Sequence, residues 1–198
     1  DPAMPAAPTL FEPDVNACAV TRAGRVALLV DAESYFPVFM RAAERAERSI
    51  VIVGWDFDSR TPLAFSGDGT PLLTLGDFLN RLCKKRRRLR VKILEWDYPM
   101  VFGVDREFPP LYGLTWKPHR HIEFHYDDTH PLAGSHHQKI VVIDDKLAFV
   151  GGLDLGARRW DSRDHRPDDP RRVAGGTPYP PFHDMMMCVD GEAARALA

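Results

Sequence analysis

The segment His137–Asp144 places a histidine, a lysine and an aspartate around a short apolar run, HQKIVVID. Side chains two residues apart on a strand share a face, so we expect His137 and Lys139 to point the same way. An imidazole can attack phosphorus as a nucleophile, and an ammonium group can hold the charged oxygens of a phosphate. Such a reaction needs no metal ion. These residue types at this spacing therefore suit attack on a phosphate.

A hairpin is expected next, because apolar runs flank Asp145-Lys146 on both sides. If these two residues form the whole turn, Gly152 lies opposite Lys139. Asp154 then lies opposite His137 and brings a carboxylate to the same place. The glycine leaves room for a ligand to approach the backbone. We therefore expect Gly152 and Asp154 to contact the substrate.

Asp144 lies an odd number of residues from both His137 and Lys139. On a regular strand its side chain points to the opposite face, so we expect it to support the scaffold. The alternative interpretation is a buried strand whose polar flanks are incidental. An isolated His-x-Lys pair is common, but the complete string is not, and we favour the chemical interpretation.

The elements that must position these residues alternate along the chain. Continuous apolar, β-branched runs predict buried strands, and longer amphipathic segments predict helices. Together with the hairpin they predict an α/β fold, in which helices flank a mixed β-sheet. Two charged or glycine-rich stretches, 61–73 and 158–181, are predicted as loops, the second of them functional or mobile. Strands are expected at 25–31, 49–55, 89–96, 122–125, 139–144, 147–151 and 184–189, helices at 34–48, 74–87 and from 192, and a loop with a short helix at 98–120.

The length and composition bound the possible functions. A chain of 198 residues can bury one sizeable core, which we place at 21–198, after a Pro/Ala-rich arm at 1–20. The net charge of -2 provides no global attraction to nucleic acid, so an anion site must be local. No apolar run approaches the roughly 18 residues that span a bilayer. The three cysteines form no CxxC pair, which argues against a disulfide framework or a cysteine-bound zinc ion.

Two longer stretches resemble a known family. SHHQKIVVIDDKLAFVGGLDLGARRWD resembles the first of two HKD motifs in the phosphatidylcholine-type branch of the phospholipase D superfamily. PFHDMMMCVDGEAARAL is similar to the segment that closes the first half of those enzymes. The resemblance implies a phospholipase D-like fold, as one half of a pseudo-two-fold, two-domain enzyme.

The resemblance also implies roles for individual residues. His137 would form a covalent phosphohistidine, and Lys139 would bind the phosphate oxygens. Asp184 matches the acid that hydrogen-bonds the second nitrogen of the nucleophilic histidine, which fixes its tautomer. The family often has serine and asparagine where this chain has Gly152 and Asp154. An anionic Asp154 would repel a phosphate, which argues against direct contact between the two. No metal ion or other cofactor is implied.

The mechanism also needs a second histidine, which protonates the leaving alcohol and then activates water or an acceptor alcohol. The family supplies it from a second His-x-Lys motif, and this chain contains no other. The second half-site could come from a separate chain or a removed C-terminal segment. Alternatively, two copies could pair around a two-fold axis, as single-motif nucleases of the superfamily do. The first-half-like sequence and the abruptly ended final helix favour the first arrangement.

Several other features have two interpretations. His119 and His121 with His125 or His130 could bind zinc, but a wall of histidines around a phosphate pocket fits better. The basic run 84–90 could touch anionic lipid or nucleic acid, but a solvated helix end fits better. Two tryptophans could line the pocket. They are Trp55, at a strand end, and Trp160, for which packing is an equal alternative.

The sequence therefore predicts a phospholipase D that hydrolyses phospholipid head groups or transfers phosphatidyl to alcohols. A homodimeric nuclease of the same superfamily is the first alternative. A non-catalytic binding module is the second, although the intact His137, Lys139 and Asp184 argue against it. We expect a phospholipid substrate and contact with a membrane surface, and no nucleic acid. Bacterial members of this branch are often exported, which favours an exported enzyme.

Overall fold

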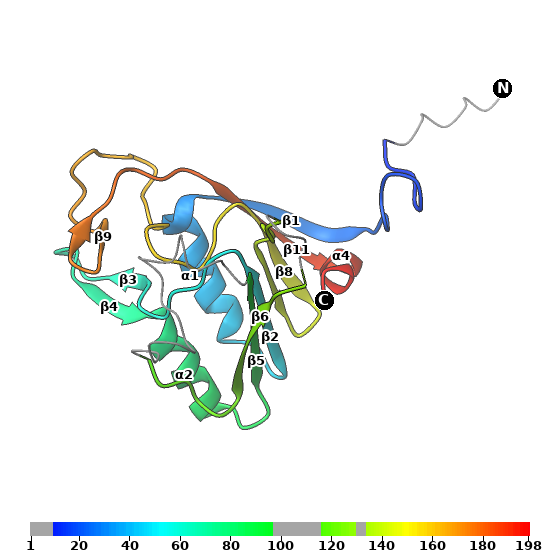
Figure 1. Ribbon diagram of the computed structural model, residues 1–198, viewed down its shortest axis with the longest axis horizontal. Coiled ribbons are helices and arrows are strands. Elements are labelled where there is room, and N and C mark those ends of the chain that lie inside the picture. The colour runs from blue at the N-terminus through cyan, green and yellow to red at the C-terminus, as the bar shows by residue number, and fades with distance from the viewer. Residues whose placement is uncertain (1–9, 97–115, 130–133) are drawn as a thin grey trace.

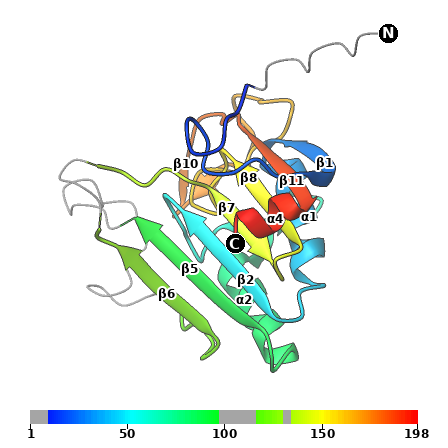
Figure 2. The ribbon, with the colours of Figure 1, turned by 90° about the vertical axis from the view of Figure 1, so that its right-hand side faces the viewer.

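The computed structural model describes residues 10–96, 116–129 and 134–198. Seven of the described strands form one mixed sheet in the order β1-β11-β8-β7-β2-β5-β6 (Figures 1 and 2). β2, β5 and β6 run parallel, and the other neighbours pair antiparallel. The strands are β1 (Ala23–Val30), β2 (Ser49–Gly54), β5 (Arg90–Trp96), β6 (Ile122–Asp127), β7 (Ile140–Ile143), β8 (Leu147–Gly151) and β11 (Met185–Gly191).

Helices lie on both faces of the sheet. α1 (Asp31–Ala43) and α2 (Leu75–Lys85) cover one face, where their aromatic and aliphatic side chains form the main core with Ile50, Ile52 and Phe149. The short α4 (Glu192–Ala196) lies on the other face, where Ala194 packs against a smaller cluster. Figure 2 shows α4 in front of the sheet and the other two helices behind it.

Most of the expected strands form within a few residues of their predicted bounds. β2 and β5 follow the continuous β-branched runs, whose alternate side chains enter the main core. The helix predicted from residue 34 to residue 48 is wrong at both ends, because α1 covers Asp31–Ala43. The chain leaves the helix early because the backbone N–H groups of Glu47 and Arg48 bind the Asp144 carboxylate.

The loop predicted at 61–73 is also wrong, because this stretch forms a hairpin of β3 (Pro62–Phe65) and β4 (Pro71–Thr74). Its tip is closed by hydrogen bonds among Ser66, Asp68 and Thr70. Gly69 has φ +86°, a left-handed conformation that glycine adopts without steric cost. A pattern of short strands that begin with proline hides such a hairpin from sequence analysis.

The long excursion at 158–181 is anchored at its centre. Arg172 is buried, and its Nη1 lies 2.9 Å from Oδ1 of Asp161, which is buried as well. The guanidinium also donates to the backbone carbonyls of Pro167 and Tyr179. The segment contains a small hairpin of β9 (Val173–Ala174) and β10 (Thr177–Pro178). These hydrogen bonds therefore hold the segment together from within.

Some sequence predictions lie outside the described residues. They are the first nine residues of the arm, most of the loop and helix expected at 98–120, and His130. Within the described ranges, no helix is both long and apolar enough to cross a membrane.

Candidate active site

The candidate site lies where β7 begins and β2 ends. β7 runs antiparallel to β2, so Ile140 pairs with Val53 and the residues before β7 lie beside the end of β2. Trp55 follows β2, and Trp96 closes the parallel neighbour β5. The carboxyl ends of parallel strands are the usual place for ligands in α/β sheets. His137 and Lys139 thus reach the edge of the sheet that such folds use for binding.

An aromatic wall stands behind the predicted nucleophile. The exposed imidazole of His137 packs against Trp55, with ring centroids 6.0 Å apart and planes tilted by 59°. Trp55 in turn stacks on Trp96 at 6.3 Å. The imidazole is therefore backed by apolar rings on one side and open to solvent on the other. A phosphate can approach it from the open side.

Lys139 is buried beside the same tryptophan. Its side chain is 5% exposed, and Nζ lies 5.8 Å from the centroid of the Trp55 ring. Nζ donates a hydrogen bond to the carbonyl oxygen of His137 at 3.3 Å and lies 3.0 Å from Oδ2 of Asp154. Trp55 thus contacts both members of the His-x-Lys pair, as their expected common orientation requires.

Asp154 connects this lysine to the end of β2. Its Oδ1 accepts hydrogen bonds from the backbone N–H groups of Trp55 at 2.9 Å and Asp56 at 3.3 Å. Its Oδ2 faces Lys139, and Nε of Arg159 lies 4.0 Å away. The carboxylate is fully buried and is directed at these groups. Two cations, Lys139 and Arg159, therefore lie around this one carboxylate.

Arg159 was not singled out from the sequence. Its guanidinium lies 6.0 Å from the centroid of Trp55 and 5.1 Å from that of Phe182. The only signal for it was its place in the Arg-Arg-Trp-Asp stretch, which carried part of the family resemblance. Arginine suits phosphate recognition because its planar guanidinium offers several donors at once.

The register of the hairpin differs from the expectation by one residue. Ile143 pairs with Leu147, so the loop contains Lys146 as well as the two aspartates. Both Asp144 and Asp145 adopt positive φ, at 52° and 56°. The backbone N–H of Gly151, and not Gly152, therefore reaches the carbonyl of Lys139, at 3.2 Å. The prediction that Gly152 faces Lys139 is wrong.

Asp144 sits at the far end of β7 from Lys139. Its carboxylate accepts hydrogen bonds from the backbone N–H groups of Glu47 and Arg48, both at 2.7 Å, and of Ser49 at 2.8 Å. Burial alone would raise the pKa of this carboxyl group, but the three N–H groups outweigh it and the pKa is lowered. These contacts fix the chain before β2 and support the expected scaffold role.

Asp184 lies at the same sheet edge, pressed against Gly152. A Cβ atom at position 152 would overlap the Asp184 carboxylate, so only glycine fits there. Oδ1 of Asp184 accepts from the N–H of Met185 at 2.7 Å, and the Asp184 N–H donates to Asp31 at 3.3 Å. Among the described residues, no hydrogen bond joins Asp184 to His137. The role of Gly152 is therefore to leave room for the Asp184 carboxylate.

Trp160 packs inside the domain. It is 5% exposed, and its ring lies 4.7 Å from Phe65 and 4.4 Å from the guanidinium of Arg171. It also helps to line a cavity of about 660 Å³ on the side of the β3–β4 hairpin. Trp55 contacts His137 and Lys139 directly, whereas Trp160 contacts neither residue among the described ring interactions.

The histidine-rich segment does not gather as a zinc site would. The rings of His119 and His121 lie 4.7 Å apart, and the N–H of His121 donates to Nδ1 of His119. His125 faces Glu123 instead. Within the described ranges, one group of at least three potential metal ligands occurs, and none of these histidines belongs to it.

Comparison with known proteins gives sequence and structural relatives. No family model matches the chain. It is 27% identical over 199 residues to phospholipase D C of Dictyostelium discoideum, a match that covers 84% of this chain and 12% of that protein. It is 28% identical over 152 residues to human phospholipase D1, covering 74% and 14% respectively. The chain thus spans a small part of the length of these relatives.

Two solved structures have a similar fold. One is NucT from Helicobacter pylori, with a TM-score of 0.54 and 13% identity, covering 86% of this chain and 88% of that one. The other is phosphatidylserine synthase of Haemophilus influenzae, with a TM-score of 0.51 and 14% identity, covering 83% and 33%. The predicted α/β fold with a mixed sheet, similar to that of phospholipase D relatives, is confirmed. In sequence, the chain is similar to enzymes of the phospholipase D superfamily.

Proposed function

We propose that this chain is the N-terminal half of a two-motif phospholipase D. It would hydrolyse phospholipid head groups or transfer phosphatidyl to alcohols. One observation carries this proposal: the exposed imidazole of His137 and the buried ammonium of Lys139 meet on Trp55 at the carboxyl edge of the sheet. The names of the sequence relatives favour a lipid over a nucleic acid substrate.

The reaction would begin at His137. A ring nitrogen attacks phosphorus, and the bond from phosphorus to the head-group oxygen breaks, which leaves a phosphohistidine. The departing oxygen takes a proton from an acid in the second half-site. Water or an alcohol then attacks the phosphohistidine and releases the product. Lys139 and Arg159 would stabilise the negative charge on the phosphoryl oxygens, because both cations lie beside Trp55, which packs against His137.

Asp184 would act as a positioning residue. Its carboxylate lies at the edge of the site, in the space that a side chain at position 152 would otherwise occupy. We assign it the role of holding the second nitrogen of His137 once substrate is bound, because catalytic hydrogen bonds often tighten only in the complex. A carboxylate in that place would stabilise the positive charge that the ring gains when its nitrogen bonds to phosphorus.

The second half-site would dock on the face of the sheet that carries α4. On this face, residues that pair across adjacent strands form an apolar row that crosses the sheet from β1 to β5. The helix α4 packs over the next row along the strands, which contains Val142, Ala148 and Val189. Leu28 in the first row is 63% exposed. Ile140, the residue after Lys139, belongs to the row, so a docked partner would border the site. The row consists of Leu28, Met187, Val150, Ile140, Val53 and Leu94.

A phospholipid substrate implies contact with a membrane surface, because the scissile bond lies at the head group of a lipid in a bilayer. The composition supports this choice over nucleic acid. The net charge of -2 gives no general attraction to a polyanion, and the positive groups beside His137 are few and local.

Native mass spectrometry, combined with two activity assays, tests the proposal. The intact particle should contain a second half of different sequence, in the same or another chain, and should cleave phosphatidylcholine in vesicles. His137→Ala should abolish the covalent phospho-intermediate, whereas His125→Ala, on an exposed histidine of β6, should retain it. A labelled intermediate that persists in His137→Ala would make the nucleophile assignment wrong. A particle that binds lipid without any turnover would indicate the binding module.

A homodimeric nuclease is the second candidate. NucT, whose structure resembles this chain over 88% of its own length, shows that a chain of similar size carries the fold once. Two copies could then provide both histidines around a two-fold axis. A pure homodimer that cuts single-stranded DNA and leaves phosphatidylcholine intact would establish this alternative and overturn the proposed lipid activity.

A further inference from the structure

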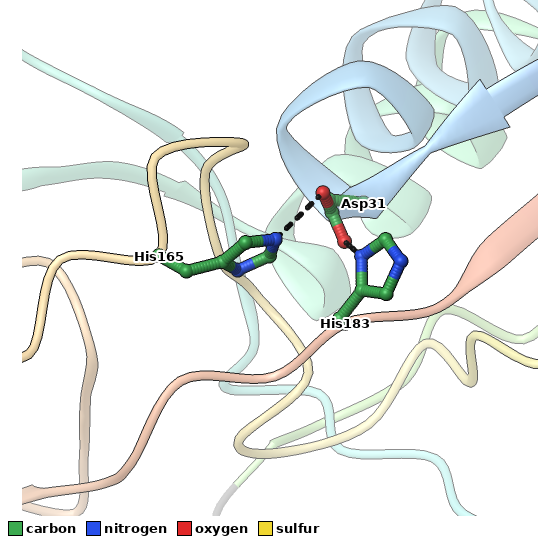
Figure 3. A group of neighbouring side chains, drawn as sticks. All are labelled: Asp31, His165 and His183. Carbon is green, nitrogen blue, oxygen red and sulfur yellow. Dashed lines mark hydrogen bonds and ion pairs between the residues drawn. The ribbon is translucent and has the colours of Figure 1, made fainter.

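Three potential metal ligands converge outside the candidate active site, from segments far apart in the sequence (Figure 3). Asp31 lies at the junction of β1 and α1, His165 in the 158–181 excursion, and His183 just before β11. One ligand atom from each residue lies within 4.8 Å of the others. Figure 3 shows both imidazoles turned toward the two oxygens of the Asp31 carboxylate. The phosphodiester chemistry proposed above uses none of the three.

The imidazole of His165 lies between two carboxylates, those of Asp161 and Asp31. Its Nδ1 lies 3.0 Å from Oδ2 of the buried Asp161, and its Nε2 lies 3.4 Å from Oδ2 of Asp31. A neutral imidazole donates from only one nitrogen, so a ring held between two carboxylates faces one of them with a lone pair. A metal cation or a second proton in that contact would satisfy both the lone pair and the carboxylate. Oδ2 of Asp31 is buried and accepts no hydrogen bond within the described structure.

His183 completes the group from the solvent side. Its Nδ1 lies 2.8 Å from Oδ1 of Asp31, and its side chain is 62% exposed. The Asp31 carboxylate is therefore buried, and the exposed His183 ring lies between it and the solvent. An ion needs such a path to reach buried ligands.

We propose that Asp31, His165 and His183 bind a divalent metal ion of the zinc class, with water as a fourth ligand. Zinc takes nitrogen and oxygen ligands at about 2.0–2.1 Å, which in a tetrahedron separates neighbouring ligand atoms by roughly 3.3–3.4 Å. The 3.4 Å between Nε2 of His165 and Oδ2 of Asp31 fits that separation. The 2.8 Å between Nδ1 of His183 and Oδ1 of Asp31 is a hydrogen-bond distance, which lengthens when the ion replaces the shared proton.

The surroundings of His165 are those of a metal-bound histidine. Such a histidine usually donates its other ring N–H to a carboxylate, which fixes the tautomer. Asp161 supplies this carboxylate, and it is held in turn by Arg172 at 2.9 Å and by the N–H of Phe182 at 2.9 Å. The outer layer of the site is therefore already built and fully buried.

The ion would join three parts of the domain. It would tie the 158–181 excursion to the start of α1 and to the segment that leads into β11. Asp31 also accepts a hydrogen bond from the N–H of Asp184 at 3.3 Å, so the ion would stiffen the support of that residue. This role is structural, and no step of the proposed phosphodiester cleavage takes place at the ion.

Zinc titration of the chelator-treated, full-length chain tests the proposal. We expect one ion per chain and a rise in the melting temperature on binding. His165→Asn and His183→Ala should each weaken binding by more than the roughly 10–100-fold that loss of an outer-layer partner causes. Asparagine tolerates the left-handed backbone of His165, φ +45°, so the first variant should fold. The control His125→Ala should bind zinc as the unmodified chain does.

The same experiment identifies the rival explanation. If a second proton occupies the contact, neither zinc nor cobalt will bind at one equivalent, and the proposal fails. Equal zinc affinity in His165→Asn would also overturn it, since the ion would then lie elsewhere. If the variants do not fold, the visible spectrum of the cobalt-loaded unmodified chain decides. A tetrahedral spectrum supports the site, and an octahedral one contradicts it.

Discussion

Lys139 and Asp154 form a buried ion pair, with Nζ 3.0 Å from Oδ2 and side chains 5% and 0% exposed. The same carboxylate caps the end of β2 through the N–H of Trp55. Asp154 is therefore neutralised by the lysine instead of facing a phosphate as a free anion. This arrangement answers the objection that an aspartate in this place would repel the substrate.

Removing Asp154 should destabilise the fold. Asp154→Ala leaves the buried ammonium of Lys139 without its partner, and breaking a buried pair in this way costs about 3–5 kcal/mol. The double variant Lys139→Met with Asp154→Leu removes both charges and should recover much of that loss, because apolar groups suit the buried site. Urea unfolding of the single and double variants measures both free energies.

The exposed ion pair between Arg81 and Glu44, at 3.7 Å, provides the control. Glu44→Ala should change the free energy of unfolding by at most about 1 kcal/mol, as exposed pairs do. If Asp154→Ala unfolds at the same urea concentration as Glu44→Ala, the pair between Lys139 and Asp154 does not support the domain.

Gly152→Ala should disable the site while leaving most of the fold intact. The added methyl group would displace the Asp184 carboxylate, and a misplacement of about 1 Å near the chemistry can lower a rate about 10²-fold. The rate of phosphodiester cleavage by the complete particle measures the effect. Gly67→Ala is the matched control, because open space surrounds that position. Unchanged cleavage in Gly152→Ala would argue against any role for Asp184 in positioning His137.

Much of the fold could be predicted because its strands are continuous apolar runs. The segments 49–55 and 89–96 are β-branched and buried, and both became parallel strands with almost the expected bounds. The β3–β4 hairpin was missed, since each strand has four residues and begins with proline. Hydrogen bonds among Ser66, Asp68 and Thr70 close its tip, and such contacts produce no hydrophobic periodicity in the sequence.

The site was predictable only as far as local spacing reaches. His137 and Lys139 are two residues apart, and both lie against Trp55 as that spacing predicted, although they precede β7 and are not part of the strand. The turn register depended on the positive φ of Asp144 and Asp145, which the residue types permit without requiring. The group of Asp31, His165 and His183 spans more than half of the chain. No periodicity relates such distant residues, and only the folded topology brings them together.

Asp144→Asn should lower stability near neutral pH. The change removes a charged acceptor from three backbone N–H groups, and loss of hydrogen bonds to a charged group costs about 1.5–3 kcal/mol each before relaxation. Folding lowers the pKa of Asp144, so its stabilising contribution is present above the unfolded pKa of roughly 3.9. The contribution disappears as the pH falls through the folded pKa.

Unfolding curves at several pH values check this. The gap between the unmodified chain and Asp144→Asn should be largest at neutral pH and should close in acid. Asp145→Asn is the control, because the neighbouring aspartate is exposed and has the same left-handed backbone. A gap that stays constant down to strongly acidic pH would show that the charge of Asp144 contributes nothing.

Substitution of Trp160 should mainly lower the stability of the domain, whereas substitution of Trp55 should mainly lower its activity. Trp160 is buried against Phe65, so Trp160→Ala should cost about 3–5 kcal/mol of unfolding free energy, as such core truncations do. Trp55 is half-buried and backs both His137 and Lys139, so Trp55→Ala should lower the cleavage rate more than the stability. Urea unfolding and phosphatidylcholine cleavage by the complete particle measure the two effects. A Trp160→Phe variant that keeps its unfolding midpoint but loses cleavage would place Trp160 in the substrate pocket, because loss of packing could then not explain the loss of activity.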